Sequence, residues 1–172
     1  MRFYCSQNLF GVIEINNWHA TGFYRHDVLS NGIASDGGNE LLLCDWSRIL
    51  RLDRNGKHIS DVVVRGYDNL HTVNLWHGEI LTASTGNDSV FLGDECIFVP
   101  RDYGWRGFTY VNSAVGYQDD IILISMRNKR SVVFFDVAKR KVEKVIVLPF
   151  LNNQHHPVPY MNGLFLVSDG DG

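Results

Sequence analysis

A pattern of about 41 residues recurs along this chain of 172 residues, and a repeat of that length constrains the fold more than any single segment does. The clearest copy is the stretch 31–45, NGIASDGGNELLLCD, which is followed by ILRLDRNG at 49–56. It predicts a short strand, an Asp-Gly turn, an apolar strand ending in aspartate, and a third strand that ends at a second glycine turn. These are the parts of one antiparallel sheet.

The start of this pattern returns three times, at spacings of 40, 41 and 44 residues, so that Asn31 aligns with His71, Asn112 and His156. Each start is followed by a turn and an apolar strand, predicted at 41–45, 80–84, 121–125 and 165–169. A third strand is predicted at 49–53, 90–94 and 132–136, and a fourth at 59–64, 96–99 and 142–148. Four short strands per repeat, with almost no helical periodicity, predict the blades of a β-propeller.

Both ends of the chain fit the same scheme. Segments 3–6, 12–15 and 21–25 match the second, third and fourth strands of a blade, and 161–169 supplies only a first and a second strand. The seventeen predicted strands exceed the sixteen of a closed four-bladed ring. We therefore expect one all-β domain over 1–172, a partial or oligomer-completed propeller whose blade parts are 1–25, 26–66, 67–108, 109–149 and 150–172. The missing blades would lie in a continuation of the chain or in a second copy, which associates through an exposed blade face.

The stretch 30–56 resembles a blade of the six-bladed NHL and SMP-30/gluconolactonase-like propellers, which repeat an Asn-Gly-Ile-Ala, Asp-Gly, apolar-strand-Asp, Arg-Ile pattern. In lactonase-like members a divalent cation, usually calcium, binds Glu, Asn and Asp side chains in the central channel. The resemblance places Asn31 on such a motif. His71, Asn112 and His156 occupy the equivalent positions of the following blades and depart from the acidic and amide pattern.

The repeat column Asn31, His71, Asn112 and His156 is the main candidate site, because the first strand of each blade lines the channel of a propeller. Two imidazoles and two amides that converge near the axis could hold a transition metal or a small polar ligand. His71 is also the candidate general base of an enzyme. In the alternative interpretation, these side chains only hydrogen-bond the channel backbone and its waters.

The loop 99–107 joins two blades and carries Tyr103, Trp105 and Arg106, a combination that suits recognition of a sugar, a peptide or an acidic group. The alternative interpretation is that Trp105 packs over the blade edge while Arg101 and Asp102 pair locally. The basic pairs near 129–130 and 139–141 are predicted to be solvated turns.

Composition narrows the partners. A net charge of -3, 20% charged residues and 45% hydrophobic residues do not predict a nucleic-acid surface or a charged partner of either sign. No apolar run is long enough to cross a bilayer, no secretory signal pattern opens the chain, and three scattered cysteines favour a reduced, cytoplasmic protein.

Two functions remain open at this level. The first is a binding or assembly module that recognises a small polar molecule or a protein partner at the channel mouth and needs no cofactor. The second is a metal-dependent lactonase, hydrolase or lyase, in which a divalent ion in the channel polarises a carbonyl or activates water beside a histidine base.

Overall fold

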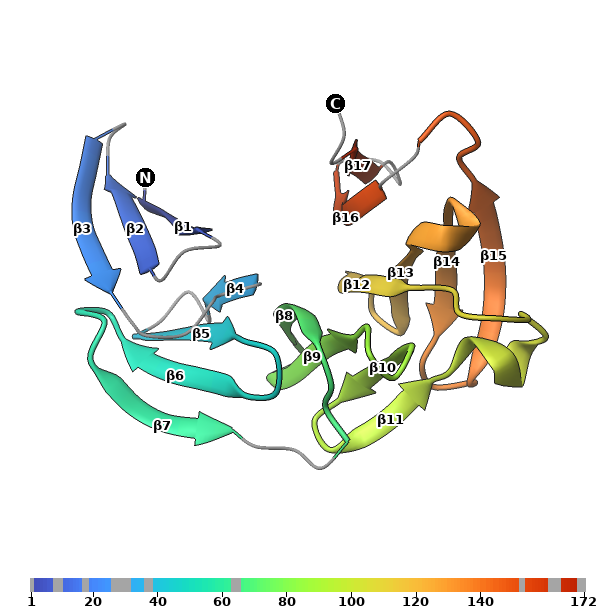
Figure 1. The fold of residues 1–172 in the computed structure, drawn as a ribbon, viewed down its shortest axis with the longest axis horizontal. Coiled ribbons are helices and arrows are strands. Elements are labelled where there is room, and N and C mark those ends of the chain that lie inside the picture. Colours follow the sequence, from blue (N-terminus) through green and yellow to red (C-terminus); the bar gives the residue numbers. More distant parts are fainter. Residues whose placement is uncertain are drawn as a thin grey trace.

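The computed structural model describes residues 2–7, 11–16, 19–25, 32–35, 39–62, 66–151, 154–160 and 165–169. Their backbone forms seventeen strands in five antiparallel sheets. Figure 1 shows the sheets side by side along an arc. The arc of sheets confirms the predicted all-β, partial-propeller fold. Within these ranges, no helix has the length and hydropathy that crossing a membrane requires.

The three central sheets each contain four strands in sequential order, and hairpin turns join consecutive strands. Their bounds are β4 (Gly32–Ser35), β5 (Glu40–Cys44), β6 (Ile49–Asp53), β7 (His58–Val62); β8 (Leu70–Trp76), β9 (Glu79–Ser84), β10 (Ser89–Leu92), β11 (Glu95–Phe98); and β12 (Val111–Gln118), β13 (Ile121–Met126), β14 (Ser131–Asp136), β15 (Lys141–Val147).

The two outer sheets are smaller. One consists of β1 (Arg2–Gln7), β2 (Gly11–Asn16) and β3 (His19–Arg25), and the other of β16 (Gln154–Pro159) and β17 (Phe165–Asp169). The strands β4, β8, β12 and β16 lie on the inside of the arc (Figure 1), and each contacts the next along the chain. They are therefore the innermost strands of consecutive blades, as the repeat predicts.

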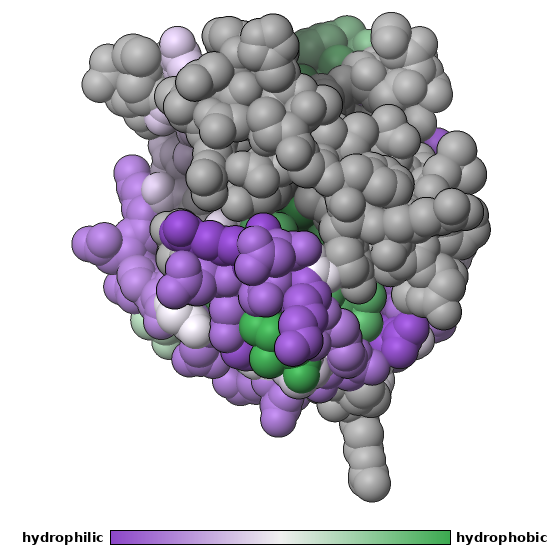
Figure 2. All heavy atoms as spheres, turned by 90° about the vertical axis from the view of Figure 1, so that its left-hand side faces the viewer, coloured by the Kyte–Doolittle hydropathy of each residue, from purple (hydrophilic) through white to green (hydrophobic). Residues whose placement is uncertain are grey.

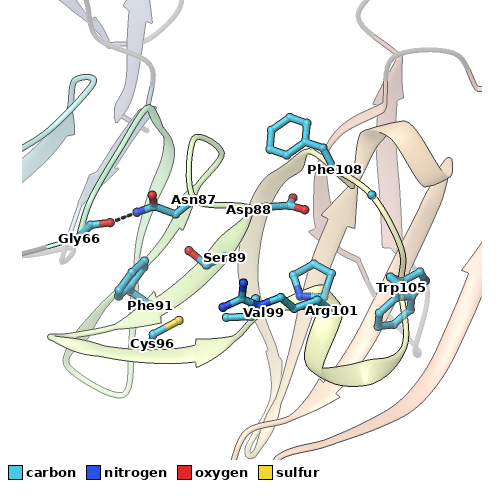
Figure 3. Close-up of a pocket in the computed structure, with 12 residues that line it drawn as sticks. Gly66, Asn87, Asp88, Ser89, Phe91, Cys96, Val99, Arg101, Trp105 and Phe108 are labelled. Carbon is cyan, nitrogen blue, oxygen red and sulfur yellow. Dashed lines mark hydrogen bonds between the residues drawn. The ribbon is translucent and has the colours of Figure 1, made fainter.

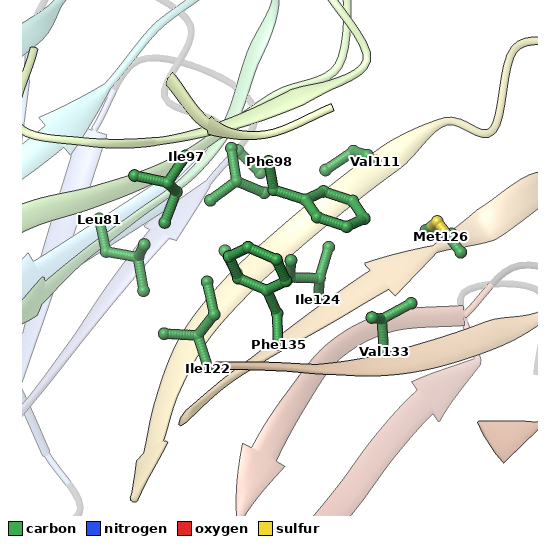
Figure 4. Packing of buried hydrophobic residues seen from close by; sticks show 12 residues of the cluster. Leu81, Ile97, Phe98, Val111, Ile122, Ile124, Met126, Val133 and Phe135 are labelled. Atoms are coloured by element: carbon green, nitrogen blue, oxygen red, sulfur yellow. The ribbon is translucent and has the colours of Figure 1, made fainter. Parts of the chain in front are cut away.

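Apolar side chains fill the space between neighbouring blades, because both faces of a blade are covered. Leu81 and Phe98 of one blade pack with Ile124 and Phe135 of the next in the largest cluster (Figure 4). On the opposite face of the blade of β8 to β11, Phe91 belongs to a second cluster, shared with the blade of β4 to β7. This two-sided burial explains why β13 and β14 are buried along nearly their whole length instead of alternating.

The outer edge of the arc is polar. Strand β7 is mostly exposed, and Asp61 on it pairs with Arg48 at 3.0 Å and with His58 at 2.5 Å. Hydrogen bonds from His58, and then the charge of Arg48, lower the pKa of Asp61. Figure 2, which shows the left-hand side of the view in Figure 1, shows mainly hydrophilic described residues with smaller hydrophobic areas among them. Charged side chains on an edge strand discourage pairing with another chain.

Two features explain recurrent motifs of the sequence. A Cβ on Gly32 would lie 3.1 Å from the backbone of Thr72 and of Val73, so the glycine that follows Asn31 lets β4 approach β8 closely. Asp45 at the end of β5 accepts hydrogen bonds from the backbone N–H groups of Ser47 and Arg48, at 2.8 and 2.9 Å. Asp45 therefore caps the turn that follows β5.

The structure also differs from the sequence prediction in detail. Two short 3-10 helices, η1 (Pro100–Tyr103) and η2 (Arg127–Lys129), occupy segments predicted as a loop and a turn. Strand β10 ends at Leu92 instead of 94, because the φ of Gly93, +55°, departs from the extended conformation of a strand. The predicted residues 63–64 lie outside the described residues.

The packing between blades leads to a prediction of stability. We expect Phe135→Ala to lower the free energy of unfolding by about 3–5 kcal/mol, because the fully buried ring contacts Phe98 and Tyr103 at centroid distances of 5.2 and 5.4 Å. Phe150→Ala, which removes a ring that is 74% exposed, is the matched control and should change it by less than about 0.5 kcal/mol. Urea unfolding followed by circular dichroism measures both, and equal losses would contradict the packing argument.

Candidate functional site

The predicted column lies at the beginnings of adjacent inner strands. His71 is the second residue of β8, Asn112 the second of β12 and His156 the third of β16. These strands are neighbours, because β8 contacts β12 and β12 contacts β16. The fourth member, Asn31, lies outside the described residues. The structure thus brings three of the four strand positions to the end of the channel side at which the inner strands begin, which we call the mouth.

A β-bulge occurs at each of these three positions. In β8, Leu70 pairs with Ser84 and Thr72 with the adjacent Ala83, so His71 is the extra residue of the bulge. The register shifts in the same way at Asn112. In β16 it shifts between residues 155 and 158, across His156. Bulges turn side chains away from the regular pleat and are frequent beside functional sites, so the sequence column marks a structural feature that recurs from blade to blade.

The three side chains nevertheless have different environments. Asn112 is fully buried, His71 is half-buried, and His156 is exposed with a backbone φ of +36°. The His71 ring packs edge-on against Tyr110, with the ring centroids 5.7 Å apart. Through this contact, His71 joins the column to further described side chains at the mouth.

Three residues that sequence reasoning missed form a chain of contacts that begins at His71. Tyr110 contacts the ring of Phe108 edge-on at 5.6 Å, and the guanidinium carbon of Arg127 lies 5.0 Å from the Tyr110 ring centroid. We call His71, Phe108, Tyr110 and Arg127 the mouth cluster. Half of the Phe108 side chain is exposed. Aromatic rings beside a guanidinium form a surface that binds flat or anionic groups.

The backbone of Tyr110 is held in an unfavourable conformation. Its φ of +58° lies in the left-handed region, which costs a bulky residue roughly 1–2 kcal/mol. The Asp88 carboxylate fastens both sides of Tyr110, since it accepts hydrogen bonds from Thr109 N–H at 2.8 Å, Thr109 Oγ1 at 2.9 Å and Val111 N–H at 2.9 Å. Arg127 N–H donates to the Tyr110 carbonyl at 3.0 Å. The surrounding bonds thus fix the position of the tyrosine ring.

A ladder of hydrogen bonds joins the linker before β12 to the turn between β13 and β14. Asn128 donates from its backbone N–H to the Thr109 carbonyl at 3.0 Å and from Nδ2 to the Phe108 carbonyl at 3.2 Å. Lys129 Nζ donates to the Arg106 carbonyl at 2.9 Å. The ladder gathers four cations from two segments, which we call the cationic ridge: Arg106, Arg127, Lys129 and Arg130.

The positive charges of the cationic ridge are not paired with acids of the described chain. None of the four side chains forms an ion pair with a carboxylate among the described residues, and Arg130 instead donates to the Pro149 carbonyl at 3.1 Å. Asp88 is close by, but its oxygens accept from the backbone and hydroxyl groups of 109–111. The ridge therefore keeps most of its positive charge.

The predicted loop residues separate into different environments. Tyr103 stacks on Phe98 with a centroid distance of 5.2 Å and donates its hydroxyl to the Arg140 carbonyl at 3.2 Å. Burial, its largest influence, raises the pKa of Tyr103. Trp105 packs edge-on against Phe98 at 6.0 Å and also lines a pocket. Trp105 thus packs against the blade as the alternative interpretation predicts, Tyr103 packs there as well, and Arg106 belongs to the cationic ridge. Ligand recognition by Tyr103, Trp105 and Arg106 stays a prediction.

The described residues test the fit of a metal only in part. They contain no group of three or more His, Cys, Asp or Glu residues placed to hold a metal ion. The described column supplies imidazoles at His71 and His156 and an amide at Asn112, without a carboxylate. Such donors suit a transition metal better than calcium, which prefers oxygen ligands. Metal binding by Asn31, His71, Asn112 and His156 stays a prediction.

Comparisons with known proteins identify the fold. No protein-family model and no curated protein sequence matches the chain. The structure is similar to a catalytically inactive virginiamycin B lyase from Staphylococcus aureus solved with quinupristin, with a TM-score of 0.76 at 11% identity over 98% of this chain and 59% of the lyase. It is similar to the WD40 β-propeller domain of Doa1, with a TM-score of 0.76 at 13% identity over 99% of this chain and 58% of that one.

A third similar structure is the glutaminyl cyclase of Myxococcus xanthus, with a TM-score of 0.60 at 13% identity over 97% of this chain and 81% of the cyclase. Identities this low show a common fold and carry no residue roles. The chain is a β-propeller, and it spans less than two thirds of the length of the lyase and of the Doa1 domain.

The bonds around Tyr110 predict that Asp88 positions the mouth cluster. We expect Asp88→Asn to lower the free energy of unfolding by about 1–3 kcal/mol, because hydrogen bonds to a charged acceptor are replaced by weaker ones and one acceptor oxygen is lost. Asparagine also tolerates the φ of +53° at this position. Asp102→Asn, which removes an exposed carboxylate 3.7 Å from Arg101, is the control and should change the stability by less than about 0.5 kcal/mol in urea unfolding.

Proposed function

We propose that this chain is a β-propeller binding module that recognises an acidic segment of a protein partner at the mouth. The observation that carries the proposal is the cationic ridge beside the exposed Phe108 ring. Four cations that pair with no described carboxylate attract an acidic chain, and an exposed aromatic ring adds apolar contact area.

The shape of this surface favours an extended segment over a small molecule. The ridge follows the ladder between the linker at 106–110 and the turn at 127–130, and it therefore extends along the surface. Protein segments bind along such surfaces, whereas small ligands are usually enclosed by a concave pocket. A small polar molecule at the mouth cluster is the competing occupant, and it would depend on His71 and Tyr110 more than on Lys129.

The bulk charge does not argue against this surface. A net charge of -3 predicts no charged partner, whereas local potentials decide association. The finer assignment to the NHL or SMP-30-like type, the cytoplasmic location and self-association through a blade face stay predictions from the sequence.

The proposal predicts binding of an acidic, aromatic peptide. A fluorescein-labelled peptide of alternating Glu and Phe should bind at 50 mM salt, and the double variant Arg106→Gln/Lys129→Gln should bind it about fivefold to tenfold more weakly, because each exposed charge contributes roughly 0.2–1 kcal/mol. Fluorescence anisotropy measures the affinity, and rising salt should weaken binding to the wild type more than to the variant.

The control is the double variant Lys57→Gln/Lys141→Gln, which removes the same charge from exposed positions in other turns and strands. It should bind the peptide like the wild type. Equal weakening in both double variants would mean that only net charge matters, and that result would refute a specific site. A labelled peptide with Lys in place of Glu should not bind, and strong binding of it would also overturn the proposal.

A metal-assisted lactonase, hydrolase or lyase is the second candidate. The observation in its favour is the bulge at His71, Asn112 and His156, which lie on adjacent inner strands. In this function His71 would bind the ion or act as the base. The similar structures of a lyase and a cyclase are consistent with a propeller enzyme but carry no roles for these residues.

The enzyme candidate predicts a bound transition metal. Purified protein should then contain about one zinc, manganese or similar ion per chain. His71→Ala should lose most of this bound metal, because an imidazole ligand is removed. Plasma mass spectrometry measures the content before and after dialysis. His77→Ala, which removes an exposed histidine from the β8–β9 turn, is the control. Metal-free wild-type protein after growth with these metals would contradict the enzyme candidate and leave the binding module unaffected.

A further inference from the structure

A pocket lies beside the mouth, between the outer strands of the second complete blade and the linker that follows it. Its volume is about 650 Å³. Strands β10 and β11 supply Ser89, Phe91 and Cys96, and the linker supplies Arg101, Trp105 and Phe108. Figure 3 shows these side chains around one space. The volume is in the range of small-molecule sites.

The walls of the pocket are mainly apolar and aromatic. Phe91, Trp105 and Phe108 contribute rings, and Val99 and Pro100 contribute aliphatic surface. The Phe91 ring is fixed by an edge-on contact with Tyr67 at 5.1 Å, and Trp105 is fixed by its contact with Phe98. Rings held by the core lose little conformational freedom on binding, so they are suited to a flat aromatic ligand.

One charged side chain reaches across this apolar space. The Arg101 side chain extends toward Ser89 and Cys96 in Figure 3. Its contact with Asp102 is long, 3.7 Å, and both residues are exposed there, so the pair is weak. The other acid of the pocket, Asp88, directs its oxygens to the linker backbone and Thr109. The guanidinium is therefore available for an anion.

A buried hydroxyl lies opposite the guanidinium. Ser89 is only 2% exposed, and its Oγ makes no hydrogen bond to an oxygen or nitrogen of the described residues. The polar group beside it is the Cys96 thiol. A thiol is a weak partner, so the hydroxyl can donate to a better acceptor. A buried hydroxyl without a strong partner that lines a pocket indicates a place for a ligand atom.

Cys96 itself does not indicate covalent chemistry. Burial is the largest influence on it and raises the pKa of the thiol, so little of it is thiolate near neutral pH. The nucleophilic form of a cysteine is the thiolate. The pocket is therefore suited to binding, and Cys96 serves as a reporter of occupancy.

We propose that this pocket binds a small aromatic carboxylate, with its ring among Phe91, Trp105 and Phe108 and its carboxylate between Arg101 and the Ser89 hydroxyl. Two charge-assisted hydrogen bonds and contacts with the aromatic rings on one side of this open pocket provide the recognition. The site is distinct from the cationic ridge, because Arg101 and Ser89 belong to neither the ridge nor the mouth cluster. Phe108 borders both, and Asp88, which lines the pocket, also bonds to the linker that carries Tyr110.

The test uses sodium 2-naphthoate and its neutral isostere 2-naphthamide. Saturating naphthoate should slow the alkylation of Cys96 by iodoacetamide at pH 8.5 at least fivefold, measured by mass spectrometry of the Cys96 peptide. Calorimetry should give a saturable isotherm for naphthoate and at least tenfold weaker binding of the amide. Arg101→Gln should weaken naphthoate binding about tenfold or more, because it removes a charged hydrogen-bond donor.

Two further variants complete the test. Ser89→Ala should weaken naphthoate several-fold while the protein still unfolds cooperatively, and Lys57→Gln, the matched removal of a distant exposed cation, should leave binding unchanged. Equal affinity for the acid and the amide, unchanged affinity in Arg101→Gln, or alkylation of Cys96 at the same rate with and without naphthoate would each overturn the proposal. Peptide binding at the ridge should persist in Arg101→Gln, which separates failure at this pocket from failure of the proposed function.

Discussion

The structure depends on the burial of both faces of each central sheet. Within the blade of β8 to β11, Leu81 belongs to the cluster shared with the following blade, whereas Ile80 and Phe91 belong to the cluster shared with the preceding one. A four-stranded antiparallel sheet in isolation would expose both of these apolar faces to water. Each central blade therefore depends on its neighbours for stability. The apolar area that one blade buries is the same contact that buries the facing side of the next blade, so the hydrophobic stabilisation belongs to the pair.

The same relation between neighbouring blades shapes the mouth. Asp88 lies in the β9–β10 turn of one blade but bonds to Thr109 and Val111 at the start of the next. Thr85 from the same turn donates to the Val111 carbonyl at 2.7 Å. These bonds cross from blade to blade, and together they offset the cost of the left-handed backbone of Tyr110. Repeat packing thus produces a rigid platform at the point where the inner strands begin.

The fold was predictable from the sequence because the repeat shows directly in the spacing of apolar and turn residues. Alternation, apolar runs and turn residues recur at nearly constant spacing, and they located the strands to within a few residues. The alignment also found the bulge positions at His71 and Asn112, without indicating that they are bulges, since an extra residue shows only in the pairing register. The ends of strands were less predictable where a glycine such as Gly93 begins a turn early.

The mouth cluster could not be predicted in this way. Tyr110 and Arg127 are separated by seventeen residues, and their contact depends on the hairpin of β12 and β13, which returns the chain to the mouth. The pair Lys129 and Arg130 was predicted to lie in a solvated turn, because the sequence does not show that Arg106 lies beside this turn. The signal that was present, three aromatic residues at 105, 108 and 110 just before a repeat start, indicates a surface but not its geometry.

Net charge is a poor guide to this molecule for a physical reason. A total of -3 averages over the whole chain, whereas electrostatic attraction falls off within a Debye length of about 8 Å at physiological salt. Acids such as Asp61 and Asp136 are paired with nearby cations, Arg48 and Lys139, so their charge is compensated locally. The cations of the ridge have no such described partner. A partner that approached the mouth would therefore meet the potential of the ridge and not the average over the chain, because local pairing, more than composition, sets the potential of each face.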